Sequence, residues 1–231
     1  MSFNIEGLES KSPQEVMKWA LETFKDRVAL ASSFGAEDVV LIDMLVKISP
    51  SARIFTLDTG RLPQETYDLM DKIREKYKIN IEAYYPDTRT VEGVVKEHGF
   101  NLFYKSVQLR QLCCKVRKID PLTRAMKDLD AWICGLRRQQ AVTRTEIKKV
   151  EIDAAHNSIL KINPLADWTE TDVWDYIKKN KVPFNALHDK NYPSIGCAPC
   201  TRAVKPGEDV RAGRWWWETP EQKECGLHKG G

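Results

Sequence analysis

Short apolar runs alternate with amphipathic segments through most of the chain. Runs at residues 27–32, 53–58 and 79–85 are bounded by turn residues and predict buried strands. Segments with helical spacing accompany them, over residues 14–25, from Asp38 to about Lys47, and from about Pro63 to Tyr77. Strands that alternate with helices predict a mostly parallel sheet flanked by helices on both faces, which is the α/β class.

The same alternation continues into the second half of the chain. Residues 90–98 and 106–128 favour helices, and the second is expected to break or kink near Pro121, because proline disrupts a helix interior. Residues 131–135 predict a further buried strand, and residues 150–162 contain strand-like segments. These elements extend the predicted sheet beyond its first three strands.

One more helix is expected before the pattern changes. Residues 169–179 are amphipathic, and Thr169 with Asp172 forms an acidic variant of a capping box at the helix start. From about residue 183 onward Pro, Gly and Trp dominate. Regular structure is therefore expected to become sparse there.

A run of three tryptophans indicates where this irregular part lies. Trp215, Trp216 and Trp217 would not all remain in water, so we expect the C-terminal part to wrap back onto the domain. We predict a single α/β nucleotide-binding domain over residues 1–205 and a C-terminal segment with an irregular tail over residues 206–231.

The composition is that of an ordinary globular protein. Hydrophobic residues make up 42% of the 231 residues, and no apolar run approaches the roughly 20 residues that cross a bilayer. The N-terminal residues lack the basic start and apolar stretch of a secretory signal, so we expect a cytoplasmic protein. The net charge of +3 is too small to argue for nucleic acid, and we expect neither nucleic acid nor membrane as a partner.

Four cysteines are spaced as candidate metal ligands. Cys113 and Cys114 are adjacent, and Cys197 and Cys200 form a CxxC turn in which two thiolates can face one ion. Structural zinc accepts four thiolates, but neighbours on a helix point roughly 100° apart, which suits the separated irons of a cubane better. Both metals stay open at this point. A fifth cysteine, Cys134, lies in a predicted buried strand and is expected to be inert.

The sixth cysteine has a different setting. Cys225 lies in the motif ECGLH near the end of the chain, with no second thiol close to it in the sequence. His228 and basic residues upstream are able to stabilise a thiolate, which would make Cys225 a nucleophile. The alternative for His228 is an idle residue of the tail. The cysteines therefore divide into a binding set and a candidate reacting residue.

Two turns follow the first two predicted strands. The turn SSFGAED joins a strand to a helix, where backbone N–H groups and two serine hydroxyls can bind an anion. The segment LDTGR ends the second strand, where polar groups would meet a ribose or a base. Their alternatives are a purely structural turn and a helix cap, respectively.

Taken together, these motifs resemble a known family. The segments SSFGAED, LDTGRLPQETY, QLCCKVRK, WICGLRRQQAVTR, PSIGCAPCTRAV, GEDVRAGRWWWE and ECGLH resemble the assimilatory adenylyl-sulfate reductases, which belong to the phosphoadenylyl-sulfate reductase family. The resemblance runs from about residue 12 to residue 228. It implies an adenine-nucleotide alpha hydrolase-like fold, in agreement with the alternation of strands and helices.

The resemblance implies a reaction and a cofactor. It implies reduction of adenosine 5′-phosphosulfate to sulfite and AMP, with Cys225 as the nucleophile that forms an S-sulfocysteine and with thioredoxin or a similar dithiol as the reductant. It also implies one [4Fe-4S] cluster, held by Cys113, Cys114, Cys197 and Cys200. Where many relatives carry Thr, this chain has Cys134, and the role of that thiol is left open. A homo-oligomer is compatible with the resemblance.

The resemblance also implies a set of substrate-binding residues. Those expected in the phosphate loop and nucleotide floor are Ser32, Ser33, Phe34, Gly35, Glu37 and Asp38. Those expected near the adenosine are Leu57, Thr59, Gly135 and Arg144. Those expected to face the phosphosulfate are Lys118, Arg211, Arg214 and His228.

Three other functions were weighed against this one. The first alternative lies within the same family: the chain prefers 3′-phosphoadenylyl sulfate as its substrate, or it accepts both nucleotides. From another class, it would be a zinc-stabilised nucleotide-binding or nucleic-acid-binding module in which Cys225 is incidental. An ATP pyrophosphatase that thiolates RNA is disfavoured, because the first turn lacks the SGGxDS pattern of such enzymes.

Overall fold

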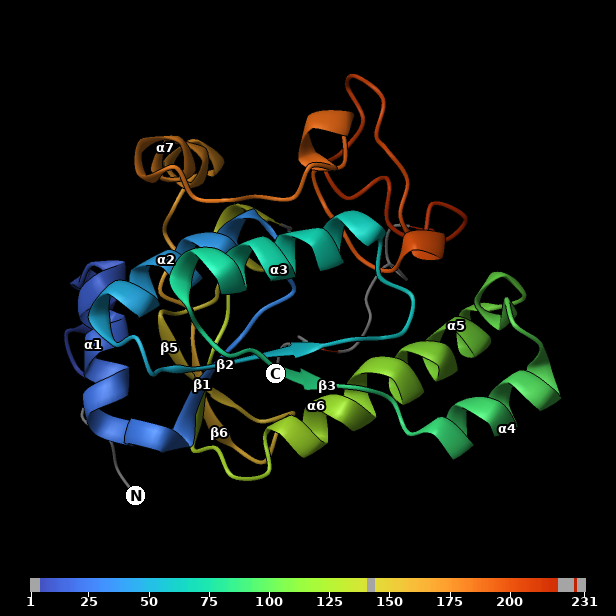
Figure 1. Ribbon diagram of the computed structural model, residues 1–231, viewed down its shortest axis with the longest axis horizontal. Coiled ribbons are helices and arrows are strands. Elements are labelled where there is room, and N and C mark those ends of the chain that lie inside the picture. The colour runs from blue at the N-terminus through green and yellow to red at the C-terminus, as the bar shows by residue number, and fades with distance from the viewer. Residues whose placement is uncertain (1–4, 141–143, 220–226, 228–231) are drawn as a thin grey trace.

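A single sheet forms the centre of the molecule (Figure 1). The computed structural model describes residues 5–140, 144–219 and 227. Within these residues, six strands lie in the order β3-β2-β1-β4-β6-β5, and all neighbours are parallel except β5 and β6. The strands are β1 (Val28–Ala31), β2 (Arg53–Leu57), β3 (Glu82–Tyr84), β4 (Ala131–Ile133), β5 (Val150–Asp153) and β6 (Ile159–Ile162). The predicted, mostly parallel sheet is confirmed.

Helices cover both faces of this sheet. They are α1 (Pro13–Phe24), α2 (Ala36–Ile48), α3 (Gln64–Tyr77), α4 (Thr88–His98), α5 (Val107–Cys114), α6 (Asp120–Ala125) and α7 (Glu170–Asn180). In Figure 1, α2, α3 and α7 lie on one side of the sheet, and α6 lies on the other with α4 and α5 beyond it. None of the helices in the described part of the chain is long and apolar enough to cross a membrane.

The alternation of side chains along the strands gives each face its own core. Leu30 of β1 packs in the cluster formed with α1, α2 and α3, whereas its neighbour Ala29 packs with Leu122 of α6 and Trp132 of β4. Successive residues of a strand point to opposite faces, so a strand that is apolar throughout is buried on both sides. The continuous apolar runs of the sequence are explained by this double burial.

Helix starts follow the capping signals in the sequence. At α1, the Ser12 N–H donates to Glu15 Oε2 at 2.9 Å, and Pro13 occupies the first helical position. At α7, the Thr169 N–H donates to Asp172 Oδ2 at 2.8 Å and completes the predicted capping box. Both helices therefore begin where the sequence indicated.

The helical segment predicted over residues 106–128, with a break or kink near Pro121, is divided. The structure has α5, a π-helical turn over Lys115–Ile119, and then α6 with Pro121 in its first turn. The widened turn precedes the proline, which has no N–H for the carbonyl four residues earlier. β3 is also shorter than the predicted strand over residues 79–85.

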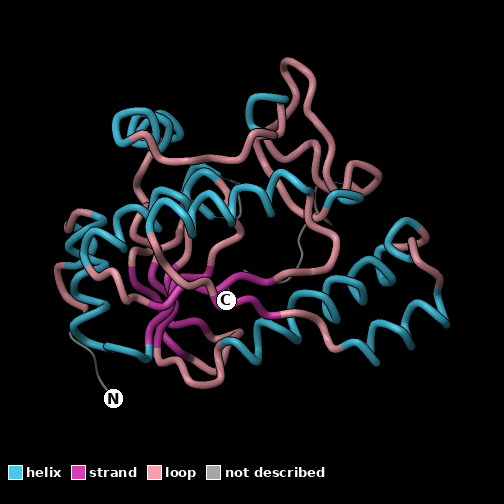
Figure 2. The backbone as a smooth tube through the Cα atoms, viewed as in Figure 1, coloured by secondary structure: helices cyan, strands magenta, loops and turns pink. Residues whose placement is uncertain are grey.

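The chain after α7 crosses the top of the sheet as loops and short turns (Figure 2). An isolated antiparallel bridge joins Thr201 to Arg214 and holds these two parts of the segment together. Gly213 is required there, because a Cβ on it would lie 2.2 Å from the Arg202 carbonyl oxygen. Trp215 is 2% exposed and Trp216 is 39% exposed, so the tryptophan run is buried in part. The boundary at residue 205 stays a prediction.

Candidate active site

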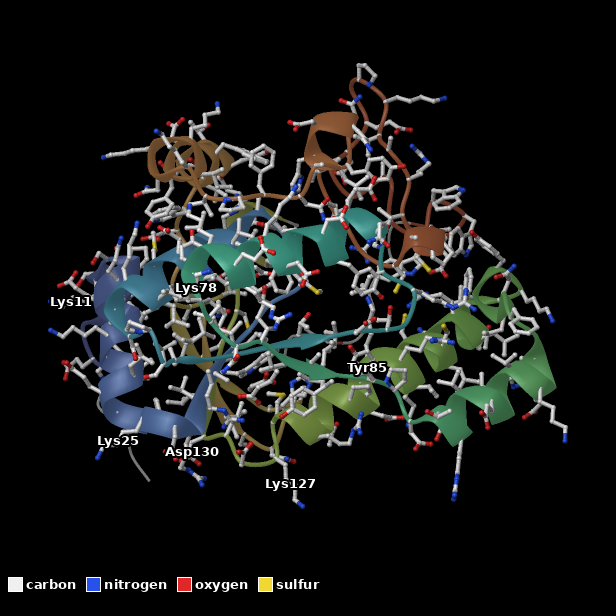
Figure 3. All side chains as sticks on the ribbon, viewed as in Figure 1. Lys11, Lys25, Lys78, Tyr85, Lys127 and Asp130 are labelled. Atoms are coloured by element: carbon white, nitrogen blue, oxygen red, sulfur yellow. The ribbon has the colours of Figure 1, made fainter. Side chains whose placement is uncertain are left out.

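A cavity of about 880 Å³ opens at the carboxyl ends of β1, β2 and β4. Ser32, Thr59 and Gly135 each follow one of these strands, and all three line the cavity. Lys25 and Asp130 mark the opposite, amino-terminal ends of β1 and β4 (Figure 3). Parallel strands bring their carboxyl ends to one edge of the sheet, which is where α/β proteins bind ligands.

The loop between β1 and α2 is held by its own polar groups. The N–H and hydroxyl of Ser33 donate to Asp38 Oδ2 at 2.6 and 2.8 Å, and the Phe34 N–H donates to Ser32 Oγ at 3.1 Å. Phe34 has a φ of 60°. The N-cap residue of α2 is Gly35, so no side chain at that position accepts a hydrogen bond from the first N–H groups of the helix. A fixed loop at an uncapped helix start is a suitable place for an anion, because backbone N–H groups there lack partners within the helix.

Asp38 is the most strongly perturbed group of this loop. Burial raises its pKa from an ordinary value of 3.8 to about 6, although hydrogen bonds from Ser33 oppose the shift. The carboxylate of Glu37 nearby raises the pKa of Asp38 further. Asp38 therefore holds the loop in shape at the cost of a buried charge.

The segment after β4 is tied to the loop and to itself. Arg137 Nε donates to Glu37 Oε1 at 2.8 Å. The amide of Gln140 accepts from Arg144 Nη1 at 2.5 Å and from the Arg137 N–H at 3.2 Å, and it donates to the Gly135 carbonyl at 3.1 Å. One amide side chain thus links a strand end to a cavity-lining arginine.

Arg214 brings a cation from the C-terminal segment into the cavity wall. Its Nη1 donates to Ser194 Oγ and to the Ile195 carbonyl, each at 3.3 Å, and its guanidinium lies 4.7 Å from the Trp215 ring centroid. A Cβ at Gly196 would lie 2.4 Å from Arg214 Nη2. A side chain at residue 196 would therefore require this guanidinium to shift.

Four cysteines meet in a second, smaller pocket of about 20 Å³ beside the cavity. Two come from the end of α5, and two from the turn Ala198–Cys200 and the residue before it; all four form one apolar cluster with Phe103 and Trp215. Three residues line both the pocket and the cavity, namely Lys118, Arg214 and Trp215. The predicted ligands, which are Cys113, Cys114, Cys197 and Cys200, are thus brought together.

The donor set of this pocket consists of four thiols, which can hold a single zinc ion or an iron–sulfur cluster. Within residues 5–140, 144–219 and 227, no three His, Cys, Asp or Glu side chains are grouped so that they could hold a metal ion. Burial, followed by repulsion from neighbouring thiols, raises the pKa of Cys200 to about 12, so ionisation of the Cys200 thiol requires a cation. Trp215 Nε1 is buried with no hydrogen-bond partner among the described residues, and Thr59 Oγ1 lies 3.2 Å from Cys197 Sγ. Hydrogen bonds to the cysteine sulfurs are among the features that tune iron–sulfur clusters, and the Thr59 hydroxyl is placed for one such bond.

Most of the residues predicted to bind substrate line the cavity. They are Ser32, Ser33, Gly35, Glu37, Asp38, Leu57, Thr59, Lys118, Gly135, Arg144, Arg211 and Arg214. Phe34 is not among them, because its side chain is 1% exposed in the core beneath the loop. Cys225 and His228 lie outside the described residues. Leu227, which stands next to His228 in the sequence, lines the cavity.

Several cavity residues escaped the sequence analysis. Arg137, Gln140 and His188 line the cavity, and burial lowers the pKa of His188. Arg137 and Gln140 lie in the motif WICGLRRQQAVTR, but nothing in the motif indicated which of its polar residues turn inward. Cys134 also lines the cavity, and burial raises its pKa well above the ordinary value, as expected for an inert thiol.

Comparison with known proteins gives consistent matches. Residues 27–203 match the family described as phosphoadenosine phosphosulfate reductase domain. The chain is 53% identical over 203 residues to an adenosine 5′-phosphosulfate reductase of Burkholderia cepacia, covering 88% of this chain and 81% of that protein. It is 46% identical over 228 residues to the enzyme of the same name from Pseudomonas aeruginosa, covering 96% of this chain and 84% of that one.

Solved structures give the same family and a wider fold likeness. A phosphoadenylyl-sulfate reductase of Candida auris superposes with a TM-score of 0.74 at 31% identity, over 88% of this chain and 99% of that one. An FMN adenylyltransferase of Candida glabrata superposes with a TM-score of 0.57 at 11% identity, over 92% of this chain and 74% of that one. The second likeness concerns the fold alone.

Proposed function

The chain belongs to the phosphoadenosine phosphosulfate reductase family, and on that premise we propose that it reduces adenosine 5′-phosphosulfate to sulfite and AMP. One observation carries the proposal. A single cavity at the carboxyl ends of three parallel strands gathers residues from the β1–α2 loop, the ends of β2 and β4, and the C-terminal segment. The curated relatives at 46% and 53% identity are named for reduction of this nucleotide.

The proposed reaction proceeds through a covalent intermediate on Cys225. Its thiolate attacks the sulfur of the phosphosulfate, an S–S bond forms, the S–O bond to the phosphate breaks, and AMP leaves with the electron pair. A thiolate of a reduced dithiol protein of the thioredoxin type then attacks Cys225 Sγ and releases sulfite. The second thiol of that protein closes its disulfide and frees Cys225, so the dithiol supplies both electrons.

Cations are needed because the nucleophile and the substrate are both negatively charged. Lys118, Arg211 and Arg214 line the cavity, and we assign them to the phosphosulfate. Arg144 is assigned to the nucleotide at the Gly135 side. Fixed cations at an anionic reacting centre lower its barrier without reorganisation during the reaction. Leu227 lines the same cavity one residue before His228, and this proximity in sequence supports the assignment of the ECGLH motif to the site.

We also propose that the four clustered cysteines hold one [4Fe-4S] cluster. The thiols line one pocket beside the cavity, with Arg61, Arg117 and Lys118 around them to balance negative charge. Such a cluster supplies fixed charge and order next to the substrate, because the thiol reaction takes its electrons from the dithiol. An anaerobic absorption spectrum separates this proposal from a zinc site, since zinc alone gives no broad visible band.

The decisive experiment is mass spectrometry of the protein mixed with adenosine 5′-phosphosulfate and no reductant. We expect a sulfite-sized adduct on Cys225 alone, released as sulfite when reduced thioredoxin is added. Cys225→Ser should carry no adduct, and Cys134→Ser serves as the matched control that should carry it. An adduct on another residue, or none, would overturn the mechanism. Initial rates with 3′-phosphoadenylyl sulfate in parallel decide whether the chain prefers that nucleotide or accepts both.

A further inference from the structure

A buried ion pair joins the cysteine-bearing helix to the C-terminal segment. Arg110 of α5 is bound by Glu218 through two hydrogen bonds, from Nε to Oε1 at 2.9 Å and from Nη2 to Oε2 at 2.7 Å. The side chains are 0% and 2% exposed. A bidentate arginine–carboxylate pair fixes orientation as well as distance, so it is suited to holding two segments in one arrangement.

Trp215 lies between this ion pair and the substrate cavity. The guanidinium of Arg110 lies 4.9 Å from its ring centroid, and the guanidinium of Arg214 lies 4.7 Å from it. Trp215 is buried and has a φ of 40°, a left-handed conformation that a bulky residue adopts only where its surroundings hold it. The Glu218 N–H donates to the Trp215 carbonyl at 2.9 Å, so the backbone of Glu218 closes a turn that begins at the tryptophan.

Arg214 is joined directly to this turn, because it precedes Trp215 in the chain and its guanidinium lies 4.7 Å from the Trp215 ring centroid. Its two hydrogen bonds described above are each 3.3 Å long. The backbone of Arg214 is fixed by its bridge to Thr201. The residue after it, Trp215, contacts the Arg110 guanidinium and is thereby connected to the ion pair.

We propose that Arg110 and Glu218 form a latch that positions Arg214 for the phosphosulfate. The proposal rests on the proposed function and adds two positioning residues to it, neither of which lines the substrate cavity. Removing the Glu218 charge takes away the bidentate carboxylate partner of the buried Arg110 guanidinium, which is costly. Relief of that cost requires the turn at Trp215 to shift, and Arg214 shifts with it.

The latch also contacts the cysteine pocket, so a change in the latch can affect that pocket as well as the cavity. Arg110 lies four residues before Cys114, on the same face of α5, and lines the cysteine pocket. The test must therefore separate an effect on Arg214 from an effect on the metal content. Iron per chain is measured for every variant for this reason.

The test is a double-mutant cycle between Glu218→Gln and Arg214→Ala, measured as kcat/KM for adenosine 5′-phosphosulfate on iron-loaded protein. A positioning error of about 1 Å can cost as much as 10²-fold, so we expect Glu218→Gln to lower kcat/KM by about 10-fold to 100-fold. The double variant should be no slower than Arg214→Ala alone, because the latch acts through Arg214. Iron per chain should stay that of the parent.

A matched control and two conservative variants keep the outcome clear. Glu82→Gln removes one partner of the bidentate pair between Arg53 and Glu82, which lies away from the cavity, and should leave kcat/KM unchanged. If Glu218→Gln does not fold, Glu218→Asp and Arg110→Lys replace it in the cycle. These variants retain the charges but lose the geometry of two parallel hydrogen bonds. We expect each to lower kcat/KM by a few-fold in the parent and to have no effect in the Arg214→Ala background.

The outcomes distinguish the latch from the proposed function. Effects of Glu218→Gln and Arg214→Ala that multiply, a normal kcat/KM in folded Glu218→Gln, or a loss of iron in step with activity would each overturn the latch. An Arg214→Ala variant that turns over the nucleotide normally would overturn the assignment of Arg214 in the proposed function.

Discussion

Gly135 approaches Asp38 so closely that a Cβ on the glycine would lie 2.4 Å from Asp38 Oδ1. The same Cβ would lie 3.0 Å from the Glu37 Cβ. The carboxylate cannot move away cheaply, because two hydrogen bonds from Ser33 hold it. The end of β4 and the β1–α2 loop therefore meet at van der Waals contact, and only a residue without a side chain permits it.

Gly135→Ala should displace the β1–α2 loop and weaken nucleotide binding. The side chain would separate the strand end from the loop, and both of these line the cavity. We expect the dissociation constant for AMP, measured by calorimetry, to rise at least about 10-fold, because packed backbone does not yield to a clash of this size. Gly93→Ala is the control, since a Cβ there meets nothing within 4 Å in α4. Alanine at residue 93 should instead stabilise the helix by about 0.5–1 kcal/mol. Equal AMP binding by both variants would contradict the prediction.

The raised pKa of Asp38 should be visible in the stability of the protein. With a folded pKa of about 6 against an ordinary 3.8, the folded protein retains a proton that the unfolded chain has lost between these pH values. The contribution to stability is therefore greatest at low pH and falls as pH rises from about 4 to about 6. The difference of about two pH units corresponds to about 3 kcal/mol at most.

Urea unfolding of the parent and of Asp38→Asn across this pH range measures the effect. The free energy of unfolding of the parent should fall relative to that of Asp38→Asn as pH rises, and the difference should become constant above about pH 7. Comparing the two proteins cancels the titration of all other groups. Parallel pH profiles would show that Asp38 titrates normally.

Gln140 should support nucleotide binding through Arg144. Gln140→Leu removes the acceptor for Arg144 Nη1 and the donor for the Gly135 carbonyl while keeping a similar volume. We expect KM for the nucleotide to rise by about 10-fold to 100-fold, with a smaller change in kcat, because one charged hydrogen bond of about 1.5–3 kcal/mol is lost. Gln111→Leu, at an exposed position of α5, is the control. A lowered kcat at constant KM would argue that Arg144 acts on the reacting group instead.

Cys114→Ser should lose iron and activity together. The thiol is buried beside three others, and a hydroxyl at this position is a poor ligand for iron. Iron per chain and turnover are measured on the same preparation. Cys134→Ser is the matched control, because Cys134 is buried outside this pocket. The Cys134→Ser variant should contain as much iron as the parent protein. Iron loss with normal turnover would refute the link between the cysteine pocket and the reaction.

The sequence allowed the sheet, its flanking helices and the location of the cavity to be predicted, because these depend on local patterns. The capping box at Thr169 and the apolar runs of β1 and β4 are such patterns. The π-helical turn was missed, because a single extra residue in a helix turn leaves no mark on the apolar spacing.

Contacts between distant segments were beyond prediction for a different reason. The pairs Arg137–Glu37 and Arg110–Glu218 join residues 100 and 108 positions apart, and a charged residue gives no sign of its partner. Phe34 was expected at the substrate because of its place in the motif, but the left-handed turn sends its side chain into the core. Local patterns specify elements, and three-dimensional packing decides which side chains of a motif face the cavity.

The wall shared by the cavity and the cysteine pocket limits how this protein can change during evolution. Lys118, Arg214 and Trp215 each line both the cavity and the cysteine pocket. A substitution at any of them therefore changes both at the same time. A lineage that lost the four thiols would inherit a wall shaped for them, with cations left beside a void. Recovery would require coordinated replacement of the wall itself, so the cysteines and these three residues are expected to persist, or to disappear, as a set.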